Sequence, residues 1–451
     1  MKIIFLGGTQ TVTGSKYLVH SGDTRVLVDC GLFQGYKWLR ERNWQPLPLD
    51  IDQLDAVVLT HAHLDHSGYI PLLYSKGYRG PVYCHPATEA LCGILLPDSG
   101  HLQEEDARFY ARHRLGKHAH PEPLYDRQTA ERCLELFQPI RFEQPVEVGS
   151  LRFHLQPAGH ILGAGSVILQ GEGKTVGFSG DVGRPDDLFM HPPQPLPALD
   201  LLLLESTYGD RRHTDTDPFE QLAGVVSETV AKGGIVLIPS FAVGRAQLLQ
   251  HMLATLMEQG RIPQLPVYLD SPMAIDVSDI YCRYNKYLRL NREQSRRMYQ
   301  AVSYVDSVDQ SKALEQLNYP HIIIAGSGMV TGGRILHHMK RLLPDHRTTV
   351  LLTGYQAGGT RGAKMLQGVE SVRIHGEWVE CRARVEMLDG LSGHADHLQI
   401  GQWLQGSALP DDCAIQLIHG DPDALEAQRD FLRRTTRYRV EVAGYRHILT
   451  L

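Results

Sequence analysis

Short apolar runs separated by glycine-rich turns characterise the chain before Leu201. Runs of this length, bounded by turn residues, predict strands. Strands that follow one another through hairpins indicate antiparallel or mixed sheets. A helical pattern near Thr88–Leu96 and a charged segment typical of a solvated helix, Gln103–His118, interrupt them. The strands expected here are Lys2–Leu6, Tyr17–His20, Val26–Asp29, Ala56–Thr60, Val82–Cys84, Arg152–Gln156, Ser166–Gln170 and Thr175–Ser179.

The pattern changes after the apolar run Leu201–Leu204. From Pro218 to about Gln356, short apolar strands alternate with helical patterns, which predicts a parallel, doubly wound sheet. From about Val372 onward, strands return, accompanied by helices. A chain of 451 residues is too long for one simple core. We therefore expect an α/β block inserted within a mixed α/β domain. The strands of the block are Ile235–Ile238, Val267–Leu269, Ile322–Ala325 and Val350–Thr353, and the late helices are His397–Leu404 and Ala424–Arg434.

Composition narrows the class of protein. The formal net charge of −6, from 45 basic and 51 acidic residues, argues mildly against a nucleic-acid partner when taken alone. A local cationic groove is compatible with it, because steering depends on where the charges lie. Seven dispersed cysteines without a Cys-x-x-Cys pair are typical of reduced thiols in the cytoplasm.

The sequence shows no membrane segment. No apolar run approaches the roughly 20 residues that a membrane span needs. The apolar start, Met1–Leu6, is broken at once by Gly7-Gly8, so it is expected to form a first strand rather than a signal peptide.

Candidate metal ligands are concentrated in His61-Ala62-His63-Leu64-Asp65-His66, directly after the expected strand Ala56–Thr60. Residues two apart in an extended segment point to the same side, so His61 and His63 can converge on one metal. The following turn toward a helix can swing Asp65 and His66 toward a second metal. Imidazole nitrogen and carboxylate oxygen together suit zinc. A histidine-rich surface loop is the alternative.

Two later segments supply further ligand types at strand ends. His160 follows the expected strand Arg152–Gln156, and Asp181 follows Thr175–Ser179. Either residue alone would be a weak signal. Their order and spacing complete a site in which a carboxylate can bridge two cations.

These motifs resemble those of the metallo-β-lactamase superfamily, and all five of its usual motifs are matched. Asp29, in Val28-Asp29-Cys30-Gly31, corresponds to the first motif, where the family uses the aspartate to support the ligands. The resemblance implies two zinc ions per chain. It assigns one zinc to His61, His63 and His160, the other to Asp65, His66 and a late histidine, and the bridging position to Asp181.

Several strand-to-helix turns of the later chain are rich in glycine or serine. Helix N-termini of this kind accept phosphate readily, and Arg245 and Arg334 would add charge-assisted hydrogen bonds. Tight turns alone would explain any single loop, but several of them on one sheet favour a phosphate-bearing substrate. The segments are Leu204–Asp210, Pro239–Arg245, Asp270–Ala274, Ala325–Met329 with Gly332–Arg334, Gly354–Ala357, Leu391–Asp396 and Leu417–Gly420.

Together these segments resemble the β-CASP family of nucleases over essentially the whole chain. Glu205 matches that family's motif A, His394 its motif B and His419 its motif C. Histidine at motif C is similar to the RNA-processing members, including the cleavage and polyadenylation factor nucleases and ribonuclease J. By the same resemblance, His419 completes the second zinc site.

The resemblance implies a fold and a division into domains. A metallo-β-lactamase αββα sandwich is expected in residues 1–207 and 369–451, the second part carrying an RNA-specificity segment. An inserted β-CASP domain with a parallel α/β sheet is expected in 208–368.

We expect hydrolysis of an RNA phosphodiester, with two zinc ions lowering the pKa of a bridging water to about 7. His394 would protonate the leaving 3′-oxygen, and Glu205 would orient it. Single-stranded RNA is expected to thread a cleft between the domains. The catalytic candidates are His394, Glu205, Asp65 and Asp29, and the phosphate-binding candidates are Arg245, Ser327, Arg334 and Ser392.

Three alternatives stay open: a thioester or lactone hydrolase on the same metal site, a DNA-directed nuclease, and a catalytically silent RNA-binding subunit. The sequence does not decide between endonuclease and 5′-exonuclease action, or between monomer and homodimer.

Overall fold

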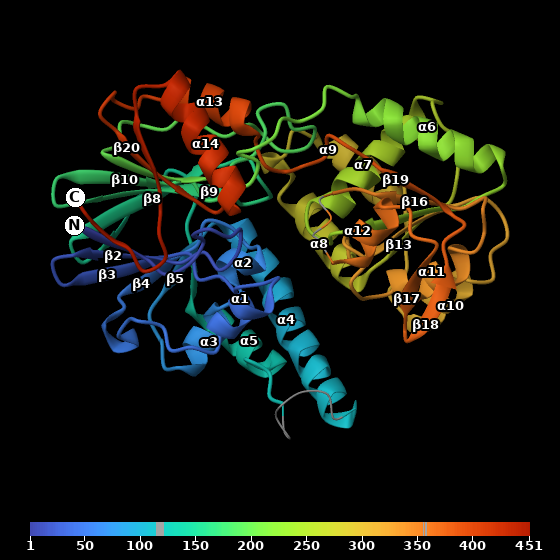
Figure 1. Cartoon of the computed structure of the whole chain (residues 1–451), viewed down its shortest axis with the longest axis horizontal. Coiled ribbons are helices and arrows are strands. Elements are labelled where there is room, and N and C mark those ends of the chain that lie inside the picture. The colour runs from blue at the N-terminus through green and yellow to red at the C-terminus, as the bar shows by residue number, and fades with distance from the viewer. Residues whose placement is uncertain (114–120, 355, 357–358) are drawn as a thin grey trace. The chain divides into compact units, whose positions relative to one another are not determined.

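The computed structural model describes residues 1–113, 121–354, 356 and 359–451. These residues divide into two compact units (Figure 1). The first unit comprises Met1–Arg212 and Gly393–Leu451, and the inserted unit comprises His213–Ser392. An α/β block inserted into a mixed α/β domain is therefore present, as the pattern predicted.

The inserted unit extends beyond the segment 208–368 that the sequence assigned to it. The reason is strand β19 (Arg384–Met387), which pairs in parallel with β16 (Thr349–Leu352) and so belongs to the sheet of the inserted unit. The chain returns to the first unit only at Gly393. A boundary at 368/369 would separate this strand from its partner.

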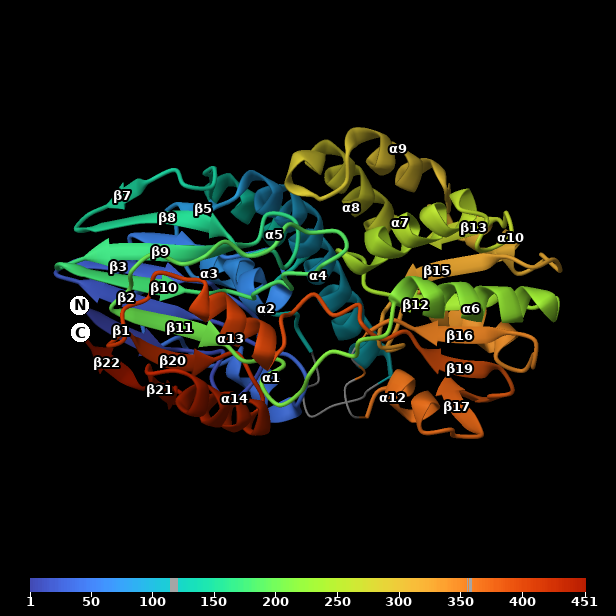
Figure 2. The same ribbon diagram turned by 90° about the horizontal axis from the view of Figure 1, so that it is seen from above.

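Two sheets, each seven-stranded within the described residues, form the centre of the first unit (Figure 2). The first has the order β22-β1-β2-β3-β4-β5-β6, and the second has the order β21-β20-β11-β10-β9-β8-β7. Both mix parallel and antiparallel pairs, as expected. Their bounds are β1 Lys2–Phe5, β2 Tyr17–Ser21, β3 Thr24–Val28, β4 Ala56–Val58, β5 Val82–Cys84, β6 Phe137–Pro139 and β22 Ile448–Thr450, then β7 Val146–Val148, β8 Leu151–Pro157, β9 Gly165–Gly171, β10 Lys174–Phe178, β11 Leu201–Glu205, β20 Ala414–Ile418 and β21 Arg439–Val442.

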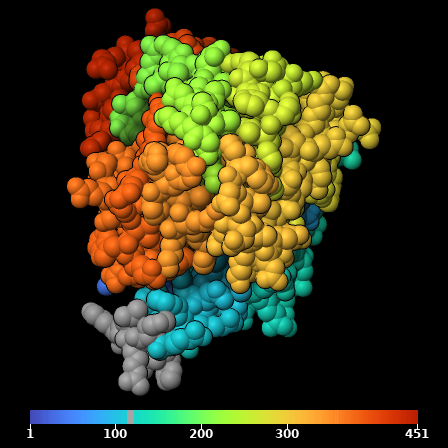
Figure 3. Space-filling model, turned by 90° about the vertical axis from the view of Figure 1, so that its right-hand side faces the viewer, coloured from blue at the N-terminus to red at the C-terminus, as the bar shows by residue number. Residues whose placement is uncertain are grey.

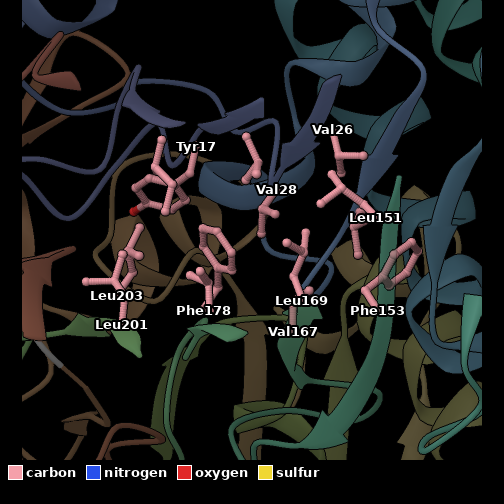
Figure 4. Close-up of a cluster of buried hydrophobic side chains, with 14 of the residues drawn as sticks. Tyr17, Val26, Val28, Leu151, Phe153, Val167, Leu169, Phe178, Leu201 and Leu203 are labelled. Carbon is pink, nitrogen blue, oxygen red and sulfur yellow. The ribbon is translucent and has the colours of Figure 1, made fainter. Parts of the chain in front are cut away.

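Strand β11 shows why the unit has layers. Leu201 and Leu203 lie in the core between the two sheets, among the side chains of Figure 4. Leu202 and Leu204 belong to the core on the opposite face of the same sheet, beneath helices α13 (His397–Gln405) and α14 (Pro422–Thr435). A strand buried on both faces is a continuous apolar run, and each buried leucine contributes about 1.5–3 kcal/mol.

Helices cover the outer faces of both sheets in Figure 1, and this confirms the predicted αββα sandwich. The first sheet is covered by helices from the N-terminal piece of the unit, and the second by helices from its C-terminal piece. Their bounds are α1 Lys37–Arg42, α2 Leu64–Ser67, α3 Ile70–Ser75, α4 Pro86–His113 and α5 Arg127–Cys133, with α13 His397–Gln405 and α14 Pro422–Thr435. Short 3₁₀ turns occur at Ile51–Gln53 and Leu134–Leu136.

Helix α4 replaces two helices expected from the sequence. The segments Thr88–Leu96 and Gln103–His118 were predicted as separate helices, but α4 runs through both without a break at Pro97. Residues 114–118 of the second prediction lie outside the described residues. Among the described residues, no helix combines the length and apolar character needed to cross a membrane.

The inserted unit is built on a parallel sheet with the order β14-β13-β15-β12-β16-β19. Helices flank this sheet, and segments from both ends of the unit lie side by side on the face seen in Figure 3. The predicted parallel sheet is confirmed. The strands are β12 Val236–Ser240, β13 Val267–Asp270, β14 Ser303–Tyr304, β15 Ile322–Gly326, β16 and β19, with an antiparallel hairpin of β17 Ser371–Ile374 and β18 Glu377–Glu380. The helices are α6 Pro218–Ala231, α7 Arg245–Glu258, α8 Pro272–Arg283, α9 Arg292–Gln300, α10 Val308–Leu314, α11 Ile335–Leu342 and α12 Arg361–Leu366, with a 3₁₀ turn at Asn285–Tyr287.

Candidate metal centre

The histidine-rich segment lies between the end of β4 and the start of α2, where the backbone changes from extended to helical. His63 is the N-cap of α2, and Asp65 and His66 fall within that short helix. The extended part leaves His61 and His63 on one side. The helical turn carries Asp65 and His66 toward the second group of ligand-type residues, with His419.

Three imidazole nitrogens and one carboxylate oxygen meet at the first cluster. Nδ1 of His63 lies 3.1 Å from Nε2 of His61 and 3.2 Å from Nε2 of His160. Oδ2 of Asp181 lies 3.4 Å from the His61 nitrogen and 3.5 Å from the His160 nitrogen. Tetrahedral ligands at zinc–nitrogen distances would be about 3.3 Å apart. The four atoms are therefore spaced as the ligands of a single zinc ion.

A second cluster adjoins the first through Asp181. Nε2 of His66 lies 3.2 Å from Nε2 of His419 and 3.2 Å from Oδ1 of Asp181. Nε2 of His419 is 3.3 Å from Oδ2 of Asp65. Each oxygen of Asp181 thus faces a different cluster, so this carboxylate is placed to bridge two metal ions.

Hydrogen bonds on the far side of the rings orient them. Nδ1–H of His66 donates to Oδ2 of Asp29 over 2.7 Å, and Nδ1–H of His160 donates to the carbonyl of Gly393 over 2.9 Å. Nδ1 of His419 lies 3.1 Å from the hydroxyl of Thr207. With Nδ1 protonated in this way, the Nε2 lone pair faces the cluster, the arrangement of metal-binding histidines.

Asp29 is held in place by its own neighbours. It adopts a left-handed backbone conformation with φ 58°. Its carboxylate accepts a hydrogen bond from the backbone N–H of Thr60 over 2.8 Å and from the Thr60 hydroxyl. The Asp29 side chain therefore contacts His66 from behind and fixes its ring.

The protonation of the cluster suits metal binding. Burial lowers the pKa of His61 and of His160 well below the usual range, and the neighbouring histidines lower both further. Burial also raises the pKa of Asp65, but the hydrogen bond from His419 and the nearby His66 outweigh it and bring the value to about 2. Neutral imidazoles and ionised carboxylates are the forms that bind zinc.

His66 shows that this position attracts positive charge. Burial lowers its pKa, but the carboxylates of Asp181 and Asp29 outweigh burial and raise the pKa well above its usual value. The two carboxylates thus favour a positive charge on the His66 ring or beside it. A bound metal ion would supply such a charge. The residues present fit a pair of zinc ions.

Glu205 and His394 form a pair beside the two clusters. Nδ1–H of His394 donates to Oε1 of Glu205 over 3.1 Å. Glu205 is buried at the end of β11 and also accepts the backbone N–H groups of Val182 and Thr207. The His394 side chain is 20% exposed and stacks against Tyr208 with 6.0 Å between ring centroids.

Burial lowers the pKa of His394, but the Glu205 carboxylate and its hydrogen bond outweigh it and raise the pKa to about 9. Its ring centroid is 4.4 Å from that of His160. Nδ1 of His394 is engaged by Glu205, so Nε2 is the atom that can deliver a proton to a molecule bound at the clusters.

The four phosphate-binding candidates all lie in the inserted unit. The guanidinium of Arg334 donates to Asp270 over 2.6 Å and to the carbonyls of Val305 and Asp306. This internal engagement favours a structural role for Arg334 over phosphate binding, because its donors are already paired inside the unit.

The other three candidates occupy loops and helix ends. Oγ of Ser327, a residue with φ 91°, accepts the backbone N–H groups of Thr331 and Gly332 and so closes its own turn. Arg245 is the first residue of α7, and Ser392 is the last residue of the unit. In the expected loop Gly354–Ala357, Tyr355 and Ala357 lie outside the described residues.

Sequence reasoning missed the residues that orient the ligands. Thr60 immediately precedes His61, and Thr207 and Tyr208 follow Glu205 by two and three positions. Their proximity to the motifs was the available signal. Nothing in the sequence pointed to the backbone carbonyl of Gly393, because every residue has a backbone carbonyl.

Three family models match consecutive parts of the chain. Residues 11–220 match the metallo-beta-lactamase superfamily, residues 246–365 match the Beta-Casp domain, and residues 374–443 match the Zn-dependent metallo-hydrolase RNA specificity domain.

Curated relatives match over nearly the whole chain. Ribonuclease TTHA0252 of Thermus thermophilus is 38% identical over 435 residues, which cover 95% of each chain. Transcription termination factor FttA of Methanocaldococcus jannaschii is 31% identical over 96% of this chain and 69% of its own length. The FttA of Methanosarcina mazei is 30% identical over 94% and 67%.

A solved structure of a protein of unknown function from Enterococcus faecalis has a TM-score of 0.58 at 14% identity and covers 100% of this chain and 99% of its own. That similarity concerns the fold alone.

Proposed function

Because the chain belongs to the β-CASP family of the metallo-β-lactamase superfamily, we propose that it is a zinc-dependent ribonuclease that hydrolyses phosphodiester bonds of single-stranded RNA. The observation that carries this proposal is the pair of ligand clusters joined through Asp181, with a histidine beside them that can transfer a proton. The RNA specificity domain and the ribonuclease relative support RNA as the substrate.

The first cluster would hold one zinc ion through His61, His63 and His160, and the second cluster would hold another through Asp65, His66 and His419, with Asp181 between them. When bound, the two ions supply Lewis acidity that neutralises phosphate charge and makes water nucleophilic at neutral pH.

The residues of the chain perform the remaining tasks. Water attacks phosphorus and releases a proton to solvent as the bond to the 3′-oxygen breaks. The 3′-oxygen leaves with a proton from Nε2 of His394, which solvent then reprotonates. Glu205 fixes the tautomer of His394 through Nδ1 and favours its protonated form. His394 is a catalytic residue in this scheme, and Glu205 and Asp29 are positioning residues.

A labelled single-stranded RNA and a DNA of the same sequence test the proposal. The protein should cut the RNA far faster than the DNA, and a chelator should abolish cleavage until zinc is restored. Equal rates on the two strands would contradict the RNA assignment and leave a nuclease. Rapid turnover of a small thioester or lactone without nuclease activity would contradict the proposal as a whole.

The state of the cysteines supports action in a reducing compartment. All seven cysteines lie in the described residues, and none of them forms a disulfide. Free thiols are the usual state in the cytoplasm, where we place the enzyme.

A further inference from the structure

The segment Tyr36–Trp44 of the first unit exposes three large aromatic side chains. Tyr36 is 72% exposed, Trp38 is 53% exposed and Trp44 is 59% exposed. Isolated apolar side chains on a surface need no explanation, but three in one short segment do. We call Tyr36–Trp44 the aromatic segment.

The aromatic segment is firmly anchored, so its exposure is not a consequence of loose packing. Leu39 of α1 is buried at 3% exposure. The side chain of Asn43, 4% exposed, donates to the carbonyl of Phe33 over 2.8 Å and accepts the backbone N–H of Phe33 over 2.9 Å. Phe33 itself is buried beside Gly14, whose position leaves no space for a Cβ. The exposed rings thus project from a fixed support.

Backbone contacts connect the base of the aromatic segment to the metal centre within the same unit. The N–H of Leu32 donates to the carbonyl of Leu64 over 2.8 Å, next to the ligand Asp65. A Cβ on Gly31 would meet the Asp65 carbonyl at 1.6 Å, so the two backbones are in direct contact. The N–H of Gln34 donates to Thr13, in the loop whose Gly8 accepts the N–H of His419. The residues that lead into the aromatic segment, Gly31–Gln34, therefore lie against the loops that carry the ligands.

The charges around the aromatic segment are mostly positive. Arg42 lies over the rings of Trp38 and Tyr445, at 4.9 Å and 4.1 Å from their centroids. Arg446 lies 5.3 Å from the same Tyr445 ring. The charged groups that these contacts bring in are four cations, Lys37, Arg40, Arg42 and Arg446, and three carboxylates, Glu41, which pairs with Lys37, and Asp106 with its neighbour Glu105, near Arg40. Four cations and three carboxylates give a balance of +1, which contrasts with the −6 of the whole chain.

From this arrangement we propose that the aromatic segment is a stacking platform for the bases of single-stranded RNA that flank the scissile phosphate. This proposal rests on the proposed function. Single-stranded nucleic acid is bound by cationic surfaces carrying aromatic rings, on which successive bases stack with little regard to sequence. The platform would take nucleotides adjacent to the bond at the metal centre, with Trp38 and Trp44 as stacking residues and Arg40 as a phosphate ligand.

Charge argues against a second copy of the chain as the occupant. A twofold interface brings the same patch of both protomers together. It would oppose each cationic surface to its own copy, and like charges placed together at an interface are costly. RNA instead supplies the opposite charge.

The test compares two tryptophan variants on a labelled single-stranded RNA and on a small activated phosphodiester, bis(p-nitrophenyl) phosphate. Trp38→Ala should raise the Kd and KM for the RNA by about 5- to 140-fold, the range expected for one stacked base. Its turnover of the small diester should equal that of the wild type, because that substrate is too short to reach the platform. The matched control is Trp378→Ala, which removes a ring of 72% exposure from β18 in the inserted unit. It should leave the RNA affinity unchanged.

Salt dependence gives a second measurement. Arg40→Gln should reduce the slope of log affinity against log salt by about one, as expected for one lost phosphate contact. Unchanged affinity and slope in the platform variants would overturn the proposal, and so would an equal loss of affinity in Trp378→Ala. A wild-type dimer that the Trp38→Ala variant converts to monomer without loss of RNA affinity would assign the surface to a second copy. Absence of RNA cleavage by the wild-type protein would count against the proposed function itself. Normal RNA cleavage by the wild type, together with wild-type RNA affinity in the platform variants, would count against the platform alone.

Discussion

Two buried aspartates, one in each unit, lie in clusters of opposite character. Asp181 in the first unit is faced by four histidine rings within ion-pair distance, and no arginine or lysine of the described residues lies within that distance. Asp270 in the inserted unit accepts hydrogen bonds from Ser311 over 2.5 Å, from His338 over 2.6 Å and from Arg334 over 2.6 Å.

The difference shows what makes buried histidine and aspartate a metal site. The charge of Asp270 is balanced by the Arg334 guanidinium, which stays protonated at any physiological pH. The Asp270 cluster therefore needs no metal ion to balance its charge.

Among the described residues, only histidine rings pair with Asp181. Burial lowers the pKa of His61 and His160, whereas the nearby carboxylates outweigh burial at the other two rings and raise the pKa of His66 and His419. Carboxylates and rings facing one another in a dry site favour an added positive charge, which a metal ion would supply. Residues of the same types are therefore proposed to bind metal in one unit and to stabilise the fold in the other.

The largest expected effect comes from removing the shared carboxylate. Asp181→Ala should lose metal from both clusters, and RNA cleavage should fall to background, because each cluster loses one of its ligands. Elemental analysis and a cleavage assay measure the two outcomes. Asp270→Ala is the matched control and should retain its full zinc content. A zinc content in Asp181→Ala equal to that of the wild type would contradict the bridging position.

Removing the proton donor should affect turnover and spare the metal. His394→Ala should lower turnover by roughly 10²–10⁴-fold, the usual contribution of general acid–base catalysis, with near-normal zinc content. A substrate with a better leaving group should recover much of the loss, because its leaving oxygen needs no proton. His419→Ala should instead lose zinc, and the activated substrate should not restore the turnover of this variant. Equal zinc loss in both variants would exclude the role assigned to His394.

Disrupting the Asp270 cluster should lower the stability of the fold and leave zinc binding unchanged. Asp270→Ala removes the carboxylate that pairs with the buried His338 ring and with the partly exposed Arg334 guanidinium, so the free energy of unfolding should fall by about 3–5 kcal/mol. Ser311→Ala removes one hydrogen bond to the same carboxylate and should lower it by about 1 kcal/mol. Urea unfolding followed by circular dichroism measures both. If Asp270→Ala loses zinc as Asp181→Ala does, the contrast between the two clusters is wrong.

The clustering of the proposed metal ligands could be predicted because much of their geometry is local. His61 and His63 converge through the two-residue period of an extended chain, and the strand-end positions of His160 and Asp181 follow from the pattern of apolar runs. Glu205 was then identified by its match to motif A of the β-CASP family. In the hydrogen-bonded pairs Asp29–His66 and Glu205–His394, the two partners lie 37 and 189 positions apart in the sequence. Residue types alone do not indicate that these partners meet in the fold.

The internal partners of the inserted unit were not predictable in the same way. Arg334 follows a glycine-rich turn, which indicated phosphate binding, but its partner Asp270 lies 64 positions away on another strand. Strand β19 joined the inserted unit through its pairing with β16, a tertiary contact that its own sequence does not encode. Both results depend on which distant segments meet, and a single sequence read by pattern leaves that open.

A smaller effect is expected from the hydroxyl that orients His419. Thr207→Val preserves the shape of the side chain and removes the oxygen 3.1 Å from Nδ1. Loss of such a partner typically weakens metal binding by 10–100-fold, which competition with a chromophoric chelator measures. The control Thr229→Val removes a buried hydroxyl from the inserted unit, where it donates to the Val225 carbonyl over 2.7 Å. Equal chelator curves for Thr207→Val and wild type would contradict the orienting role.

The smallest expected effect is a pH dependence that belongs to the Asp270 cluster. Burial raises the pKa of Asp270, but hydrogen bonds from His338, Ser311 and Arg334 outweigh it and hold the pKa below its usual value. A carboxyl whose folded pKa is depressed binds fewer protons folded than unfolded. Its contribution to stability is therefore present above the ordinary aspartate pKa of about 4 and is lost as the pH falls toward the folded pKa.

Unfolding free energies measured in urea between pH 3 and pH 7 should accordingly decline more steeply on the acid side in the wild type than in Asp270→Asn, since the variant has no proton to bind at this position. The two curves should approach each other as the pH falls and should run parallel near neutrality. Chelator-treated protein is the suitable sample, because zinc release at low pH would add its own slope through the Asp181 clusters. Parallel curves over the whole range would show that Asp270 keeps an ordinary pKa, and the idea that Arg334 completes this cluster electrostatically would then fail.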